Sequence, residues 1–429
     1  MSDLLAQPLT LPCGATLSNR LVKTAMSEGL ADVDNHSTPK LEALYRRWAH
    51  SGVSLLFTGN IQVDPNYLER PLNIVIHDES GREALARLAK AGTEGGAHFW
   101  AQLSQTGRQV DAAINPAPLA PSVVELKVMR GASFNFATPR AMTEAEIEHT
   151  IAQFRFSAGE VRRVAFTGVT LHAAHGYLIS QFLSPLTNKR EDGWGGTFEK
   201  RARFLIEVIA AVREAVGPDF PIGIKLNSSD FQVGGFTAAD CVELVKLLND
   251  TSLDLLELSG GSLEQPKMMG LTLKDKDEDG AHQLTAAREA YFVSFAKEIR
   301  AVAAMPVMVV GGFRSRPAML EALENGEVDL IGLGRPLIAM PDGPARLLSG
   351  EIDRLPSFEE RFDIVRFMAW NNMQLARMGD GLAPDLELDG DEALKSFFAF
   401  ESANKQALLD RRVHVPACPL PPHEIEKQS

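Results

Sequence analysis

Cysteine is scarce in this chain of 429 residues, which contains only Cys13, Cys241 and Cys418. Because the three lie far apart and form no CxxC pair, the sequence argues against a disulfide framework, a zinc ribbon and an iron–sulfur cluster. No apolar run approaches the roughly 18 residues of a membrane-spanning helix, and the first residues lack the basic and apolar segments of a signal peptide. We therefore expect a cytoplasmic protein without a membrane partner.

Basic residues are also in the minority. The chain has 43 lysines and arginines against 56 aspartates and glutamates, which gives a net charge of −13. This balance opposes non-specific binding to nucleic acid or to anionic lipid. Hydrophobic residues make up 45% of the chain and charged residues 23%, as in ordinary globular proteins, so a sizeable core is expected.

A repeated unit runs through most of the sequence: a short apolar run that ends in polar or small residues, followed by a longer stretch with helical spacing. The runs are Leu21–Met26, Ser54–Gly59, His98–Leu103, Gly168–His172, Ile222–Leu226, Leu253–Leu258, Val307–Val310 and Asp329–Leu333. Strands that alternate with helices predict parallel pairing and right-handed crossovers. Eight such units favour the α/β class and a closed (β/α)8 TIM barrel over the alternative, an open doubly wound sheet.

Several segments lie outside this repeat. Residues at about 8–18 predict a small hairpin over the N-terminal mouth of the barrel. The long connections 104–142 and 262–284 follow strands, so we expect them at the C-terminal face, where barrels carry their chemistry. The alternation stops near residue 350. We therefore expect a barrel over residues 1–349 and a helical extension, not a separate catalytic domain, over residues 350–429.

The end of the fourth predicted strand carries His172, His175 and Tyr177. Two imidazoles and a phenol at this spacing converge if the chain turns there. A phenol has an ordinary pKa of about 10, so Tyr177 would be protonated at neutral pH and able to act as an acid. Two alternatives stay open from the residues alone: the histidines are half of a metal site, or they are structural.

The last two strands end in glycine, at Gly312 and at Gly334, which is followed by Arg335. Barrels often bind phosphate after strands seven and eight through backbone N–H groups, and a guanidinium suits phosphate. Glycine corners also occur for packing alone. Two polar residues interrupt apolar runs elsewhere: Lys225 requires a negative partner if it faces the interior, and the Gln102 amide requires hydrogen-bond partners if buried.

The stretch from His172 to Phe204 resembles a signature of the old yellow enzyme family of FMN oxidoreductases. It reads HAAHGYLISQFLSP and then NKREDGWGGTFEKRARF. Supporting matches are Leu17–Arg20, Gln102–Leu103 with Gly107–Arg108, Ala120–Ser122 and the two glycine corners, so the resemblance covers about residues 8–345.

The resemblance implies a role for each matching residue. Thr24, Ala25, Met26 and Ser27 would lie along the flavin ring, Gly59 and Gln102 at its pyrimidine edge, Lys225 beside its N1 and O2 atoms, and Gly312, Gly334 and Arg335 at the phosphate. His172 and His175 would hold a substrate oxygen, and Tyr177 would be the proton donor. Lys225 stands where the family usually has arginine, which keeps the charge but loses the planar fork.

The resemblance also implies a reaction. NADH or NADPH would reduce bound FMN, which would in turn reduce the C=C bond of α,β-unsaturated carbonyl-type acceptors, a class of small electrophilic alkenes. The alternatives are an FMN barrel enzyme that oxidises its substrate, of the dehydrogenase or demethylase type, and a metal-dependent barrel lyase. Apolar residues in the C-terminal helix favour a homo-oligomer.

Overall fold

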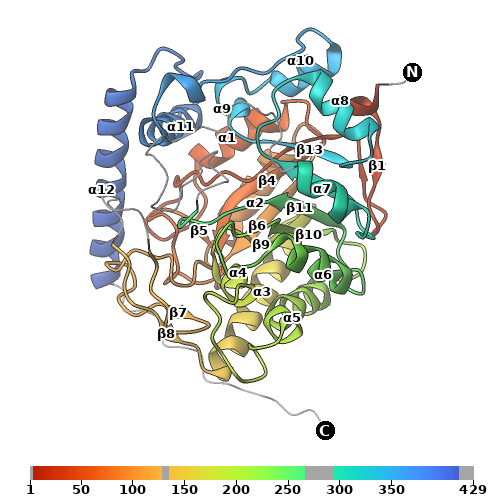
Figure 1. Cartoon of the computed structure of the whole chain (residues 1–429). Coiled ribbons are helices and arrows are strands. Elements are labelled where there is room, and N and C mark those ends of the chain that lie inside the picture. The colour runs from red at the N-terminus through yellow and green to blue at the C-terminus, as the bar shows by residue number, and fades with distance from the viewer. Residues whose placement is uncertain (1–2, 128–134, 266–292, 415–429) are drawn as a thin grey trace, which may run out of the picture.

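A computed structural model describes residues 3–127, 135–265 and 293–414 (Figure 1). Eight parallel strands form the barrel: β3 (Leu21–Lys23), β4 (Leu55–Gln62), β6 (His98–Ser104), β9 (Gly168–Ala173), β10 (Ile222–Asn227), β11 (Leu255–Ser259), β12 (Val307–Val310) and β13 (Leu330–Leu333). Each strand pairs with its neighbour, and β3 pairs with both β13 and β4, which closes the ring. The predicted (β/α)8 barrel is confirmed.

Helices cover the outside of the barrel between successive strands. They are α1 (Pro39–Ala49), α2 (Arg82–Thr93), α3 (Glu144–Arg163), α4 (Leu178–Leu183), α5 (Phe198–Val216), α6 (Ala238–Leu248), α7 (Val293–Arg300) and α8 (Arg316–Glu324). Local sequence explains their starts: α3 begins at Thr143, which exchanges hydrogen bonds with Glu146 in a capping box. Helical spacing explains their packing, because α5 buries Phe204, Val208 and Val212 against the strands.

The predicted hairpin is confirmed at the N-terminal mouth. Strands β1 (Leu9–Thr10) and β2 (Thr16–Leu17) pair antiparallel. The Cys13 N–H donates to the carboxylate of Asp254, directly before β11, at 2.8 Å. Leu17 packs with Trp100 inside the barrel, in the same apolar cluster. These apolar side chains fill the N-terminal end of the barrel, so polar groups are left to the C-terminal end.

After β13 the chain is helical, as predicted. It forms α9 (Pro336–Ala339), α10 (Gly343–Ser349), α11 (Ile364–Gly379) and α12 (Gly390–His414). Figure 1 shows α12 as a long helix along one flank of the molecule, beside α11. Leu408 of α12 packs with Tyr67 and Val110, which lie in the connections after β4 and β6. The extension therefore contacts loops at the C-terminal end of the barrel.

The long connections differ from expectation in one respect. The segment 104–142 contains a short parallel pair, β7 (Leu119–Ala120) with β8 (Arg140–Ala141), and β5 (Ile74–Val75) adds to the outer end of β4. Most of the segment 262–284 lies outside the described residues, as does the proline-rich end after residue 414. Short 3-10 turns occur at Leu4–Ala6 and Glu359–Arg361.

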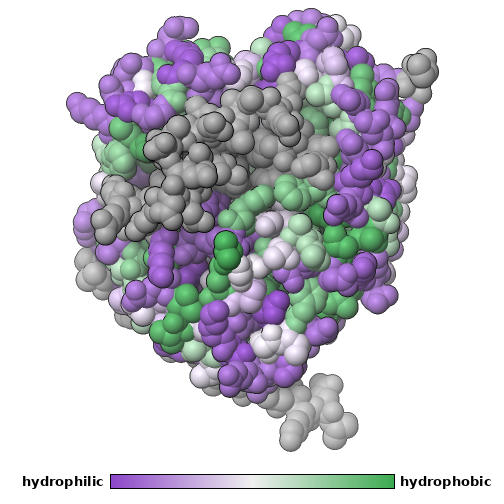
Figure 2. Space-filling model, viewed as in Figure 1, coloured by the Kyte–Doolittle hydropathy of each residue, from purple (hydrophilic) through white to green (hydrophobic). Residues whose placement is uncertain are grey.

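The described surface is mainly polar. On the face drawn in Figure 2, hydrophilic side chains are interspersed with separate apolar patches. Val365 of α11 and Phe398 of α12 are exposed, and self-association of the chain stays a prediction. Within the described ranges, no helix has both the length and the apolar character required to cross a lipid bilayer.

Candidate active site

Three aromatic side chains meet where β9 ends. His175 and Gly176 adopt φ angles of 62° and 78°, in the left-handed region, so the chain turns sharply there. The turn places the His172 ring 4.9 Å from the His175 ring and 4.7 Å from the Tyr177 ring, both edge to face. The His175 N–H donates to Asn227 at 3.1 Å, which fixes the turn against β10. The predicted convergence of the three side chains is thus present.

Both histidines are neutral near pH 7. Burial, together with His175 and Lys225, lowers the pKa of His172 well below its usual range, and burial with Lys225 lowers that of His175 to about 3. The Ala174 N–H donates to His172 Nδ1 at 3.3 Å, which assigns the ring proton to Nε2. His175 Nε2 lies 2.8 Å from Ser259 Oγ. A neutral imidazole of this kind can donate a hydrogen bond to a substrate oxygen.

The metal alternative finds no support in the ligand geometry. Across residues 3–127, 135–265 and 293–414, no three His, Cys, Asp or Glu side chains are grouped in a way that could hold a metal ion. His172 and His175 face each other and Tyr177 instead.

The Tyr177 hydroxyl faces a carboxylate that the sequence pattern did not reveal. The Glu69 carboxylate and the Asn60 side chain lie near this hydroxyl. Burial and the nearby Glu69 raise the pKa of Tyr177 well above its usual range, so the phenol keeps its proton at neutral pH. Glu69 Oε2 accepts hydrogen bonds from Ser27 Oγ at 2.6 Å and from Asn60 Nδ2. Glu69 lies in the connection after β4, where no strand or helix pattern marks it.

Lys225 has the negative partner that an interior lysine requires. Its Nζ lies 3.1 Å from Glu257 Oε1, and both side chains are almost fully buried. The two residues are directly paired in the β10–β11 register, which points their side chains the same way. Thr24 donates its hydroxyl proton to the same carboxylate and lies 3.4 Å from Lys225 Nζ. Glu257 is the one acidic residue in β11, a signal that the sequence analysis missed.

A second buried charged cluster lies beside β3 and β4. The Lys23 side chain donates to the Phe57 carbonyl at 2.8 Å, and burial lowers its pKa to about 7. Glu28 accepts hydrogen bonds from the Tyr45 hydroxyl and from the Gly59 N–H. The amide of Gly59, a predicted flavin contact, is therefore already bonded within the protein.

The two glycine corners lie side by side. Strands β12 and β13 pair in parallel, and Gly312 follows the first with φ of 87°. Gly334 and Arg335 follow the second. Arg335 Nη2 lies 3.8 Å from Glu359, which also pairs with Arg314. Two guanidinium groups thus gather near the glycine corners, and Arg314 is a further residue that the sequence analysis missed.

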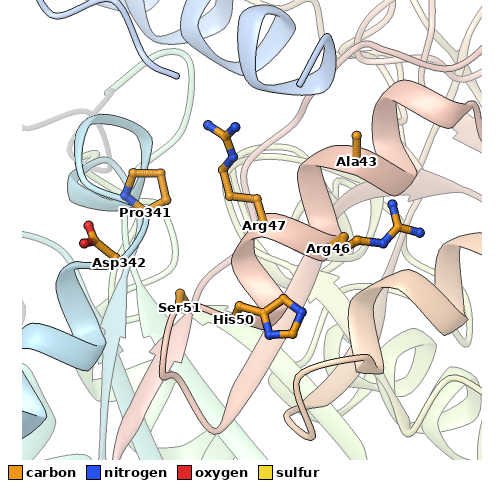
Figure 3. A pocket seen from close by; sticks show the side chains of 7 residues that line it. All are labelled: Ala43, Arg46, Arg47, His50, Ser51, Pro341 and Asp342. Carbon is orange, nitrogen blue, oxygen red and sulfur yellow. The ribbon is translucent and has the colours of Figure 1, made fainter. Parts of the chain in front are cut away.

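A surface hollow of about 450 Å³ lies elsewhere (Figure 3). Its lining residues are Ala43, Arg46, Arg47, His50, Ser51, Pro341 and Asp342. In Figure 3 the guanidinium groups of Arg46 and Arg47 point in different directions. The first pairs with Glu94 at 2.8 Å and the second donates to the Leu382 carbonyl at 2.7 Å. The hollow lies near the N-terminal end of β4, opposite the face where barrels carry their chemistry.

Comparison with known proteins decides the family. Residues 4–353 match the NADH:flavin oxidoreductase / NADH oxidase family. The chain belongs to this family. It is 38% identical over 358 residues to the NADH-dependent flavin oxidoreductase iliE of Neonectria sp., covering 80% of this chain and 46% of that protein. The chain thus spans less than half of that relative. It is 35% identical to the protein of the same name from Hypocrea jecorina, covering 78% of this chain and 86% of that one.

The fold is shared with solved members. The old yellow enzyme homologue from Zymomonas mobilis has a TM-score of 0.68 at 23% identity, covering 83% of this chain and 95% of that one. The resemblance drawn from the His172–Phe204 signature is therefore confirmed. The family consists of FMN-binding oxidoreductases that use NADH or NADPH, and the predicted enzyme class and cofactors are confirmed at this level.

The described residues fit such a flavin. Gln102 Oε1 and Glu257 Oε2 are buried acceptors that have no hydrogen-bond partner among the residues described by the structure. A flavin offers both donors and acceptors along its pyrimidine edge. Lys225 supplies a buried cation beside Glu257, and the Gly312 and Gly334 corners with Arg335 suit a phosphate.

Proposed function

We propose that this chain uses FMN and NADH or NADPH to reduce the C=C bond of α,β-unsaturated carbonyl-type acceptors. The observation that carries the proposal is the convergence of two neutral histidines and a protonated tyrosine at the C-terminal end of the barrel, where Lys225 is the neighbouring-strand partner of His172. This set can hold a carbonyl oxygen through neutral imidazoles and offers a phenol that can deliver a proton.

Residues from six parts of the chain would hold the cofactor. They are Thr24, Ala25, Met26 and Ser27 along the ring, Gly59 and Gln102 at the pyrimidine edge, Lys225 beside it, and Gly312, Gly334 and Arg335 at the phosphate. Bound FMN supplies hydride-transfer chemistry, which no side chain provides. Lys225 places positive charge where electrons would accumulate. Because Glu257 pairs with it, part of that charge is already neutralised.

The remaining steps belong to the protein. His172 donates its Nε2 proton in a hydrogen bond to the acceptor oxygen. The centre of the His175 ring lies 4.9 Å from that of the His172 ring, so His175 can share this role. Withdrawal of electrons by the bound oxygen makes the β-carbon of the alkene electron-poor. Tyr177 then gives its hydroxyl proton to the α-carbon. We also propose that the barrel, residues 1–349, carries all these groups and that residues 350–429 only support it.

Replacement of Tyr177 tests the proposal. In Tyr177→Phe, we expect alkene reduction to slow by about 100-fold or more, because general acids contribute about 10²–10⁴-fold. Reduction of the flavin by the nicotinamide should not change. Anaerobic stopped-flow absorbance, with 2-cyclohexenone as acceptor, measures both half-reactions separately.

Tyr67→Phe is the matched control, since the Tyr67 hydroxyl lies in the connection after β4, accepts a hydrogen bond from the Leu119 N–H at 3.2 Å and has no part in the proposed reaction. If the reduced wild-type enzyme ignores enones but its oxidised form is bleached by a donor substrate, the oxidising alternative replaces this proposal. If both half-reactions of Tyr177→Phe match those of the wild type, the proton-donor role is wrong.

A further inference from the structure

Glu359 is an acidic residue at the candidate phosphate site, where an anion would have to bind. It belongs to the C-terminal extension and follows the part of the chain that matches the family. Its Oε1 atom accepts a hydrogen bond from Arg314 Nη2 and lies 3.8 Å from Arg335 Nη2. Arg314 follows the Gly312 corner by two residues, and Arg335 follows the Gly334 corner directly. One carboxylate oxygen is therefore shared by both arginines.

The other carboxylate oxygen of Glu359 is anchored by its own segment. It accepts hydrogen bonds from Ser357 Oγ at 2.6 Å and from the Phe358 N–H at 3.0 Å. The Phe358 ring stacks on Trp370 of α11, with 5.2 Å between the ring centres. Because Oε2 is fixed in this way, Oε1 is directed at the arginines. The contact is therefore held from both sides and does not depend on a chance meeting of long side chains.

The two arginines differ in how much of their charge the carboxylate already neutralises. The Arg314 side chain is 8% exposed and bonds directly to Glu359. The Arg335 side chain is 26% exposed, and its distance of 3.8 Å from Glu359 is long for an ion pair. Arg335 also lies 5.6 Å from the centre of the Phe367 ring, a contact that uses no N–H group. Arg335 therefore keeps donors for a phosphate, whereas the charge of Arg314 is largely neutralised.

The net charge of this cluster is small for a phosphate monoester. Two guanidinium groups and one carboxylate carry a net charge of +1, whereas a phosphate monoester carries about −1.5 to −2 at pH 7. The carboxylate also repels the phosphate, and salt screens this repulsion less where the groups are partly buried. A bound phosphate and Glu359 would therefore compete for the same guanidinium groups.

We propose that Glu359 is a built-in competitor of the FMN phosphate and limits how tightly this chain holds its cofactor. This role goes beyond the proposed alkene reduction and rests on the proposed phosphate site at Gly312, Gly334 and Arg335. With FMN bound, Arg335 divides its donors between the phosphate and Glu359, and Arg314 stays with the carboxylate. Glu359 takes part in no chemical step, so the C-terminal extension acts here on cofactor binding alone.

Two ligands isolate the contribution of the phosphate. FMN and riboflavin differ only in the phosphate, so the ratio of the riboflavin Kd to the FMN Kd reports on the phosphate alone. Fluorescence titration of the full chain, stripped of FMN, gives both constants. In Glu359→Gln we expect this ratio to rise by about tenfold or more, because a like charge is removed and Arg314 becomes available to the phosphate. The riboflavin Kd itself should stay the same.

Further variants separate this competition from a loss of structure. Glu360→Gln changes the neighbouring, exposed glutamate and should leave the ratio unchanged. Arg314→Met leaves the carboxylate to Arg335 alone, so the ratio should fall by about tenfold. The double variant Arg314→Met/Glu359→Gln should return the ratio to near the wild-type value, because the net charge is again +1. The double variant also provides the test if Glu359→Gln alone does not fold, since neither partner of the buried pair is left without the other.

Other outcomes have distinct meanings. An unchanged ratio in folded Glu359→Gln overturns the competition, and a lower ratio shows that Glu359 positions the arginines for the phosphate instead. A wild-type ratio near one means that the phosphate adds nothing to binding, which overturns the phosphate site and the competition together. If the ratio rises as expected but the wild-type enzyme reduces no enone, the proposed reaction is wrong and the role of Glu359 stands.

Discussion

At the scale of single residues, Lys23 is an unusual titratable group. It is fully buried, its Nζ lies 4.3 Å from the centre of the Trp48 ring, and burial lowers its pKa from 10.5 to about 7. Between these two values the unfolded chain binds a proton that the folded chain does not. Stability contributed by this residue therefore rises with pH over that window.

This sign gives a testable pH dependence. We expect the free energy of unfolding of the wild type, relative to Lys23→Met, to increase by at most about 1.4 kcal/mol per pH unit between about pH 7 and pH 10. Urea unfolding of both proteins at several pH values measures it. Lys246→Met is the control, because Lys246 is half-exposed and pairs with Glu243 on a helix surface. Parallel pH profiles for wild type and Lys23→Met would show that Lys23 stays charged.

Predictions from the sequence were correct for some single residues and missed others. Lys225 was predicted to require a negative partner, since an interior lysine is costly alone, and Glu257 is that partner. Glu69 and Glu28 gave no such signal. Both lie in irregular connections, and only the path of the folded chain brings them to Tyr177 and Gly59. The predicted roles of the site residues stay predictions.

At the scale of elements, the strands were easy to predict and the loops were not. A barrel strand is buried on both sides, so its apolar run is unmistakable, and all eight predicted runs overlap barrel strands. The largest error in length is at the first strand, which was predicted over Leu21–Met26 but ends at Lys23. The β7–β8 pair was missed, since strands of two residues leave no periodic pattern.

The contact of α12 with the active-site loop yields an element-scale prediction. Arg70 and Glu401 are 11% and 21% exposed, so their ion pair is mostly shielded from water. Arg70 also donates to the Ser27 carbonyl at 3.1 Å, beside the predicted flavin contacts. In Glu401→Gln we expect a loss of about 1–2 kcal/mol in the free energy of unfolding and faster hydrogen exchange in residues 63–73.

The control is Asp391→Asn, which removes an exposed partner of Arg366 in the same helix and should change stability by less than about 1 kcal/mol. Urea unfolding and hydrogen-exchange mass spectrometry read out both variants. Equal effects of the two changes would mean that α12 contributes only general helix stability and does not hold the Glu69 connection.

At the scale of the whole molecule, barrel closure gathers the site from segments far apart in the sequence. The pairing of β13 with β3 brings Gly334 next to Thr24, with 3.2 Å between the Thr24 methyl and the position of a Cβ on Gly334. The order of strands made this juxtaposition predictable once eight units were recognised. The side-chain geometry within the barrel was not, because it depends on which buried charges pair.

A cofactor bound across so many strands should stabilise the entire fold. FMN at about 100 times its Kd is expected to raise the free energy of unfolding of the FMN-free protein by about 2.7 kcal/mol, since only the folded state binds it. Riboflavin, which lacks the phosphate, should stabilise less. In Arg335→Leu, we expect the FMN increment to fall by about 1.5–2.5 kcal/mol at the same FMN concentration, because a charge-assisted hydrogen bond is lost. The riboflavin increment should not change.

Thermal unfolding with each ligand provides the measurement, with Arg361→Leu as control, because Arg361 donates to the Leu386 carbonyl away from the glycine corners. An equal loss for both ligands would place Arg335 at the flavin ring instead of the phosphate.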